Sequence, residues 1–275
     1  MKVQPSLACT CRCLTGLIAA AAAAPVLCDD AGTEAGSLWE IGIAMGYGER
    51  TYPLVQSDDI DILVDIDIAW YGDRWFFDNG DVGFTVRDGR RTTLNLIGRL
   101  NSDRIFFSKT DTEHVSLFGF GVESVERIVV PDRDYAFEIG VELLSDGDWG
   151  RLQVSAHHDA SGRHDGYEVY ASYGRPARHG RWLFEPSFGF AWKSRELNDY
   201  YWGVRPYEAS TLLPEYEAGS GFNTHARFVA GYQLARHWTF IVATEHERLS
   251  SEAARSPLVA ERSVRSGFAG FRYTF

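Results

Sequence analysis

Hydrophobic and polar residues alternate one by one along many segments of this chain. In residues 60–70 apolar side chains fill the even positions from Ile60 to Trp70, while Asp61, Asp65 and Asp67 lie at odd positions. Successive side chains of a strand point to opposite faces, so this segment has one apolar and one acidic face. The alternation recurs, cleanly or with interruptions, in residues 38–47, 82–87, 91–100, 134–144, 149–159, 166–174, 181–192, 221–234, 237–248 and 264–275. The chain is therefore predicted to be all-β.

Two architectures are compatible with strands of this kind. A soluble sandwich turns the apolar faces inward, whereas a membrane barrel turns them outward to lipid. The strands have about 10 residues, the length with which a tilted strand crosses a bilayer, and tryptophans gather near their ends. The last strand carries Phe271, Tyr273 and Phe275 at alternate positions, similar to the C-terminal strand of bacterial outer-membrane proteins. We expect a closed, up-and-down antiparallel barrel in the outer membrane, surrounded by lipid and lipopolysaccharide.

The number of strands follows from the lengths of the links between them. Eleven segments alternate clearly, and bacterial barrels have an even number of strands with short periplasmic turns and long outer loops. The missing strand is either 74–77 or 199–204. Choosing 74–77 places the long links 48–59, 101–133, 193–220 and 249–263 outside, whereas 199–204 would put link 101–133 in the periplasm. We therefore predict twelve strands, with 74–77 as the third.

The N-terminal residues have the features of a secretory signal. Lys2 and Arg12 precede an apolar run over residues 14–27, which is too short to span a bilayer as a helix. Cleavage after Cys28 would leave residues 29–275 as one barrel domain. A lipoprotein signal is disfavoured because Leu27 stands where a small residue is expected. All four cysteines lie in this segment, so no disulfide or thiolate site is expected beyond it: Cys9, Cys11, Cys13 and Cys28.

Charge narrows the possible partners and suggests what the barrel interior contains. The formal net charge of −11 argues against a nucleic-acid partner. Strand parity turns a set of acidic residues toward the lumen: Asp61, Asp65, Asp67, Glu138 and Glu142. With basic residues of the same parity, these side chains form either a cation-preferring passage or a closed, salt-bridged interior. We favour the closed interior because twelve strands lie between filled eight-stranded barrels and open porins.

Catalytic and metal sites are not expected. His158 and His246 have lipid-facing parity, but no serine of matching parity lies within hydrogen-bond reach on a neighbouring strand, as a lipid hydrolase would need. His157 and His158 point to opposite faces and cannot share one ion. A weaker hypothesis is a divalent cation at an acidic group near the outer rim: Asp58, Asp59 and Asp61. We expect a non-enzymatic protein without cofactor or metal.

Three C-terminal segments resemble the MipA/OmpV family of outer-membrane proteins. Residues 200–204 (Tyr-Tyr-Trp-Gly-Val) are close to the family's Tyr-Tyr-Gly-Val element with Trp202 inserted, and residues 216–221 match its Tyr-x-x-Gly-x-Gly element. Ser256 and Pro257 precede the aromatic last strand. The motif residues in the two outer loops are Tyr200, Tyr201, Gly203, Val204, Ser256 and Pro257. Tyr200 and Tyr201, together with Trp202 and Tyr207, are expected to have one of two roles. They form either a sugar- or partner-binding surface, or an aromatic belt at the membrane interface or a loop folded into the lumen.

The resemblance implies an outer-membrane barrel without known catalytic residues. The best-described member of the family is a scaffold that brings a murein transglycosylase and a murein synthase together at the cell wall. Other members are linked to adhesion and to osmotic or antibiotic stress. The expectation is thus an envelope scaffold or surface-interaction protein; the alternative is a small cation-preferring channel or transporter.

Overall fold

A computed structural model describes residues 38–55, 57, 59–107 and 130–275 of the chain. The expected signal segment, residues 1–28, lies outside the described residues. None of the helices within the described ranges is long and apolar enough to cross a membrane.

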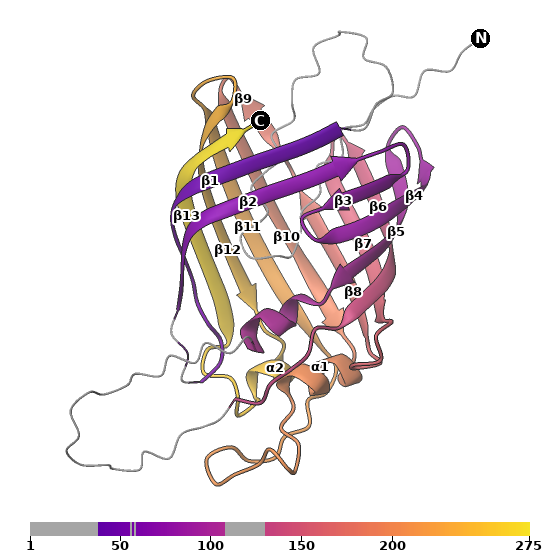
Figure 1. The fold of residues 1–275 in the computed structure, drawn as a ribbon, viewed down its shortest axis with the longest axis vertical. Helices are drawn as coiled ribbons and strands as arrows, with labels where there is room; N and C mark the ends of the chain where they lie inside the picture. The colour runs from indigo at the N-terminus through magenta and orange to yellow at the C-terminus, as the bar shows by residue number, and fades with distance from the viewer. Residues whose placement is uncertain (1–37, 56, 58, 108–129) are drawn as a thin grey trace, which may run out of the picture.

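Antiparallel strands form one closed wall (Figure 1). Their bounds are β1 Leu38–Arg50, β2 Ile60–Tyr71, β3 Trp75–Asp78, β4 Asp81–Asp88, β5 Thr92–Leu100, β6 Phe137–Gly147, β7 Gly150–Asp159, β8 Tyr167–Gly174, β9 Ala177–His179, β10 Trp182–Lys193, β11 Gly221–Gln233, β12 Trp238–Arg248 and β13 Ser263–Thr274. Neighbours in sequence pair around the ring, and β13 closes it on β1. Because β8 and β9 both pair with the same edge of β10, they occupy one wall position. The predicted barrel of twelve strands is confirmed.

The third strand lies where the link lengths placed it, and it is short. β3 turns back into β4 through Asn79 and Gly80, whose φ angles of 48° and 102° build a tight hairpin turn. An Asn-Gly pair suits such a turn because both central residues need positive φ. The rejected alternative, residues 199–204, falls instead on helix α1, Arg195–Trp202, which Ser194 caps by accepting a hydrogen bond from the Leu197 backbone N–H. The prediction of 74–77 as a strand is thus confirmed.

The two faces of the wall differ in polarity as the alternation predicts. The outer face exposes large apolar side chains on every side of the ring, among them Ile66, Leu96, Ile139 and Phe188. The interior face buries polar side chains such as Glu138, which is 1% exposed. This inside-out distribution is that of a barrel surrounded by lipid. Aromatic residues at the short-turn end include Trp39, Trp149, Trp182 and Trp238, all exposed.

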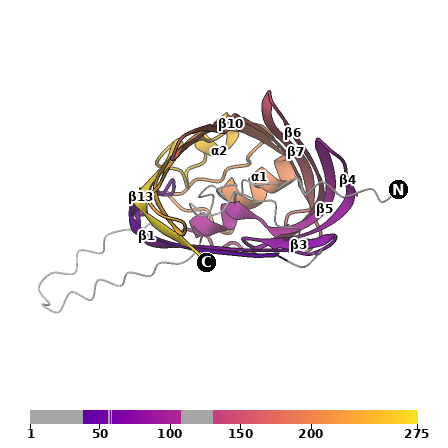
Figure 2. The ribbon, with the colours of Figure 1, turned by 90° about the horizontal axis from the view of Figure 1, so that it is seen from above.

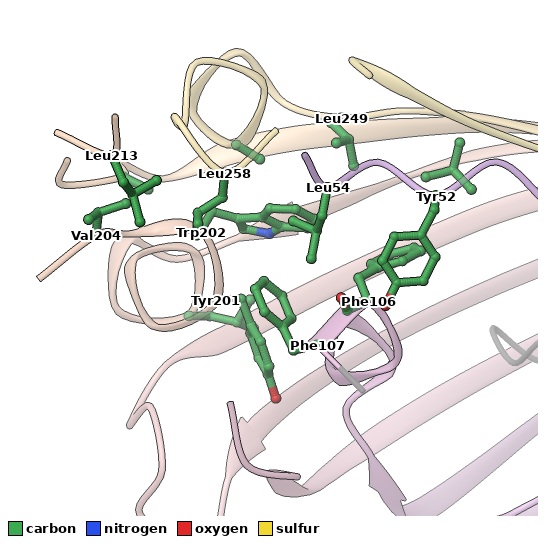
Figure 3. Packing of buried hydrophobic residues seen from close by; sticks show 14 residues of the cluster. Tyr52, Leu54, Phe106, Phe107, Tyr201, Trp202, Val204, Leu213, Leu249 and Leu258 are labelled. Carbon is green, nitrogen blue, oxygen red and sulfur yellow. Dashed lines mark hydrogen bonds between the residues drawn. The ribbon is translucent and has the colours of Figure 1, made fainter. Parts of the chain in front are cut away.

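The long loops at the other end fold together into a cap over the barrel mouth. The cap contains the 3₁₀ helix η1, Ser102–Phe107, helix α1 and helix α2, Ser251–Ala254. Seen along the barrel, these helices lie across the opening of the ring (Figure 2). Their apolar side chains, with those of the β1–β2 link, form one buried cluster around Tyr201, Trp202 and Phe107 (Figure 3). The cap therefore has a hydrophobic core of its own, which touches the barrel wall at Ile60 of β2 and Val264 of β13.

Candidate functional site

A chain of buried charges crosses the barrel interior below the cap. Arg99 of β5 donates from Nε to Glu138 Oε2 at 2.9 Å and from Nη2 to Glu168 Oε1 at 2.6 Å. Lys193 of β10 donates to both carboxylate oxygens of Asp103 in η1 at 2.7 Å. Its Nζ also lies 3.9 Å from Glu168 Oε2. Two cations and three carboxylates thus join β5, β6, β8, β10 and the cap.

Two of the other predicted interior acids, Glu142 and Asp67, are also held by polar partners. Glu142 accepts from Asn95 Nδ2 at 3.0 Å and from Gln153 Nε2 at 2.8 Å. Asp67 pairs with Arg272 of β13, and Asp65 is 8% exposed on the same interior face of β2. The structure therefore places Asp65, Asp67, Glu138 and Glu142 in the interior. This favours a salt-bridged filling over a line of free acidic charges.

Asp61 departs from the expected facing. Its side chain is exposed, and its carboxylate accepts from the Tyr47 hydroxyl at 3.2 Å on the outer surface. The cause is a register shift between Met45 and Gly48, where β1 has one residue more than β2. Such a bulge reverses which side chains face inward beyond it. Ile62 therefore faces the interior near the cap, and the expectation that Asp61 faces the lumen is corrected.

The family-motif residues form part of the cap core rather than a binding surface. Tyr201 and Trp202 are 0% exposed, and Ser256 Oγ donates to the Trp202 carbonyl at 2.6 Å. The backbone of Val204 pairs with that of Tyr216, which joins the motif segment 200–204 to the motif segment 216–221. Of the remaining motif residues, Gly203 is buried, while Tyr200 and Pro257 are half-buried at the edge. Tyr207 alone among the loop aromatics remains 79% exposed. A sugar- or partner-binding surface made of these aromatics is thus not what the cap presents.

An ion pair joins the end of the 101–133 link to the α1–β11 loop. Arg133, 2% exposed, donates to Glu208 Oε1 at 2.7 Å, to Glu208 Oε2 at 3.0 Å and to the Gly203 carbonyl at 3.0 Å. Burial opposes ionisation of Glu208, but the hydrogen bonds from Arg133 and from the Arg205 backbone outweigh it and lower the pKa of Glu208 below 4.5. Burial raises the pKa of Tyr201 far above its ordinary value, so its phenol stays neutral inside the cap.

The C-terminal signature residues lie at the short-turn end of the wall. Phe271 and Phe275 are 51% and 69% exposed on the outer face. Tyr273 packs edge-on against Trp238 at a centroid distance of 5.1 Å and against Phe275 at 4.9 Å. Phe271 likewise contacts Phe240 of β12. This aromatic group resembles the girdle that marks the membrane interface of such barrels.

The short turns carry a ring of arginines that the sequence alone did not single out. Eight exposed arginines lie in or beside the links at this end: Arg74, Arg87, Arg90, Arg91, Arg175, Arg178, Arg181 and Arg236. Only three exposed acids accompany them in these links: Asp73, Asp88 and Asp148. We call this set of arginines the basic rim. It contrasts with the net charge of −11 for the whole chain, and only knowledge of which turns share one end reveals it.

Among the histidines that raised other possibilities, His158 has a structural partner. His158 Nδ1 lies 3.0 Å from the Gly166 carbonyl, and its ring stacks on Tyr167 at 4.3 Å. His157 faces the opposite side of β7 and is 4% exposed, as alternation requires. Asp159 accepts hydrogen bonds from the backbone of the 160–165 loop. Within the described ranges, no three His, Cys, Asp or Glu side chains are placed to hold a metal ion; Asp58 lies outside them.

Several polar residues of the interior were not predicted from the sequence. Asn95 and His157 had interior parity and could have been found from the alternation. Asp103 and Asn101 could not, because they lie in a link without periodicity. Asn101 donates to Glu138 Oε1 at 2.6 Å, and Asp103 holds Lys193. The cap thus supplies part of the interior network.

The closed ring, its apolar outer face and its polar interior define an outer-membrane β-barrel protein. A family model described as MltA-interacting protein MipA matches residues 41–275. The chain therefore belongs to the MipA family, and the match extends well beyond the C-terminal segments that suggested it. Since short turns of such barrels face the periplasm, the basic rim is periplasmic and the cap is extracellular.

Individual relatives are distant. Over 110 residues the chain is 27% identical to outer membrane protein OmpV of Vibrio cholerae. The aligned segment covers 40% of this chain and 43% of that protein. The chain thus matches less than half the length of that relative. It is 21% identical to the MltA-interacting protein of Escherichia coli, over 86% of this chain and 90% of that protein. Among solved structures, a NanC porin aligns over 86% of this chain and 100% of its own, with 10% identity and a TM-score of 0.44.

Proposed function

We propose that this protein is a non-enzymatic docking protein that holds murein-active enzymes, a transglycosylase or a synthase, at the periplasmic face of the outer membrane. The basic rim is the observation that carries this proposal. Eight exposed arginines on short turns present positive charge to the periplasm. Guanidinium groups recognise carboxylates through paired hydrogen bonds, so the rim suits an acidic protein surface.

Two further points support docking over transport. The name of the Escherichia coli relative, MltA-interacting protein, describes an interaction partner. In addition, the cap core and the Arg99–Glu168–Lys193 chain obstruct the axis of the barrel. A cation-preferring channel, the alternative function, needs a continuous water-filled path with unpaired acidic groups along it. Most interior acids are instead paired with cations or amides.

Binding measurements on two charge-reversal variants test the proposal. One variant combines Arg90→Glu, Arg91→Glu, Arg178→Glu and Arg181→Glu at the basic rim. The matched control variant replaces four exposed arginines on the extracellular side: Arg163→Glu, Arg195→Glu, Arg255→Glu and Arg262→Glu. Each is refolded in lipid nanodiscs and titrated with a purified periplasmic lytic transglycosylase.

The rim variant is expected to bind the enzyme at least about tenfold more weakly, and wild-type binding should weaken with added salt because exposed charges are screened. The control variant should bind like the wild type. Arginines at a barrel rim also contact lipid phosphates, and a purely lipid-binding role would leave enzyme binding equal in both variants. Equal binding, or no binding by the wild type, would overturn the proposal.

A further inference from the structure

The barrel wall has a gap between β2 and β5 on the extracellular side of the β3–β4 hairpin. β3 pairs with β2 only at residues 69–71, and the Asn79 backbone and side chain complete the contact at Ile68. β4 reaches β5 only up to Gly98. Within the described ranges, no strand pairs with residues 60–67 of β2 on this side. In Figure 1 no strand is drawn beside this part of β2 on the same side, and strands of the far wall lie behind it.

The size of the gap follows from the hairpin's length. Four residues of β3 span about 13 Å along the strand, and tilt reduces the height further, whereas the apolar band of such barrels is about 25 Å tall. The early Asn-Gly turn therefore ends the wall roughly halfway across the membrane. Above it, residues 60–67 of β2 present about 26 Å of strand edge.

The rim of the gap lies at membrane depth. On the β2 side Val64 and Ile66 are 53% and 55% exposed on the outer face, and on the β5–β6 side Leu100 and Phe137 are 55% and 44% exposed. Such side chains belong in lipid. A strand edge at this depth is tolerated only where protein covers it or where it borders a water-filled cavity.

A cavity of about 260 Å³ reaches this gap from the interior. Its lining includes outer-face residues of the gap, Leu100 and Tyr135, and the turn residue Gly80. The same lining includes Ala191 and Lys193, which are buried in the interior. Because residues exposed to the membrane and residues of the interior share one cavity, the cavity is open through the wall in the part of the chain that the structure describes.

We infer that this cavity binds a small cationic amphiphile, which enters sideways from the outer leaflet of the membrane through the gap. The two ends of the cavity have the matching chemistry. Leu100 and Tyr135 make its membrane end apolar, and Ile105 and Phe106 of η1 add apolar surface from the cap. The interior end contains Glu168, Glu245 and Glu247. Over the whole cavity five carboxylates face two cationic side chains. The carboxylates are those of Asp81, Asp103, Glu168, Glu245 and Glu247, and the cations are Arg50 and Lys193.

The cationic groups nearest the deep end are already engaged. Lys193 is held by Asp103 at 2.7 Å, and Arg99, behind Glu168, bridges two carboxylates. Arg227 faces Glu245 across the β11–β12 pair. Glu247 accepts from Asn223 Nδ2 at 2.8 Å, a neutral donor. An added ammonium group would therefore find the Glu247 carboxylate at the end of the cavity, while its alkyl chain remains at the apolar opening.

Labelling of one cysteine inside the cavity tests the route. The four native cysteines are changed to serine, and Ala191→Cys, 8% exposed in the cavity wall, is introduced as the only thiol. The protein is refolded into lipid vesicles, its fold is checked by heat-modifiable migration, and the reaction with membrane-soluble N-phenylmaleimide is followed. Leu100→Trp then narrows the gap. Leu96→Trp is the control, on the same face of β5 but within the paired wall.

Leu100→Trp should slow labelling about tenfold or more, because the larger side chain narrows the gap. Leu96→Trp should leave the labelling rate unchanged. Dodecylamine should protect the thiol, dodecanoate should not, and Glu245→Gln with Glu247→Gln should remove the protection. Equal rates in both tryptophan variants would show that access is not through the wall. Equal protection by the amine and the acid, or none, would refute the cationic ligand. These readouts do not involve the basic rim, so they fail or succeed independently of the docking function.

Discussion

The cap and the barrel interior are two cores of opposite chemistry in one chain. The cap core packs Leu197, Tyr201, Trp202 and Leu258, each 0% exposed, from two of the long loops. A short distance below it, the barrel interior is built from Arg99, Glu138, Glu168 and Lys193, all buried. Asp103 in η1 belongs to the second core while Phe106 and Phe107 of the same helix belong to the first. The boundary between the two cores therefore passes through a single turn of helix.

The difference reflects the surroundings of each part. The cap projects into water, where burying apolar surface stabilises a fold. The barrel wall is surrounded by lipid, which is as apolar as its side chains, so the interior is stabilised by hydrogen bonds and ion pairs that satisfy one another. The two cores should therefore respond differently to substitutions.

Breaking the interior ion network should have the largest effect and should reach the whole barrel. Arg99→Met leaves Glu138 and Glu168 without their shared cation, and removing one partner of a buried ion pair costs about 3–5 kcal/mol. Urea titration of the folded, heat-modifiable fraction measures the loss. Arg178→Met at the exposed rim should change stability by less than about 0.5 kcal/mol. Equal stability of both variants would contradict a structural role for the network.

Truncating a side chain at the centre of the cap should lower stability by a comparable amount, and the loss should be confined to the cap. Trp202→Ala removes a fully buried ring, which typically costs about 3–5 kcal/mol. Hydrogen exchange should rise in α1, α2 and the cap loops while the strands stay protected. Trp39→Ala, at a ring 60% exposed on the outer face, is the control. If the strands of Trp202→Ala exchange as fast as its cap, the two cores are not separate units.

A smaller effect is expected from the hydrogen bond between the family motifs. Ser256→Ala leaves the buried Trp202 carbonyl without the donor that now lies at 2.6 Å, at a cost of about 1–3 kcal/mol. The nearby exposed Ser251 offers a matched Ser251→Ala control. Faster proteolysis of the cap in the first variant alone is the expected result, whereas identical proteolysis of both would assign the motif serine no structural role.

The smallest effect is a pH dependence confined to the cap. Because the folded-state pKa of Glu208 is lowered below 4.5, its ion pair with Arg133 contributes stability above that pH, and the contribution is lost as pH falls through the folded pKa. Exchange of the cap amides should therefore quicken in acid before the strands are affected. Glu208→Gln should flatten this dependence; an unchanged pH profile would mean that another group controls it.

The barrel could be predicted from sequence, and the cap could not, for a physical reason. A strand with lipid on one side and polar contacts on the other must alternate at every residue, so residues 60–70 or 134–144 reveal their fold locally. The cap packs Tyr52, Phe107, Trp202 and Leu258 from segments far apart in sequence, and no local period records such contacts. Only the resemblance of residues 200–204 and 256–257 to a family marked these loops.

The site residues divide in the same way. Alternation placed Asp65, Asp67, Glu138 and Glu142 inside. It misplaced Asp61, because one extra residue in β1 reverses the facing beyond the bulge. The basic rim lies in the short turns that the link lengths already assign to one end, so it could have been found from the sequence. The wall gap depends on the hairpin turn at Asn79 falling early, and it emerges only after the strands are paired.

Conductance of the refolded protein in a planar bilayer tests the central claim most directly. The claim is that the cap and the interior ion network close the barrel along its axis. The wild-type protein, shown to be folded by heat-modifiable migration, should give no discrete openings, and Trp202→Ala combined with Arg99→Met should give them. Stable cation-preferring openings of the wild type, reduced by Asp65→Asn and Asp67→Asn, would contradict the account and make the interior a passage.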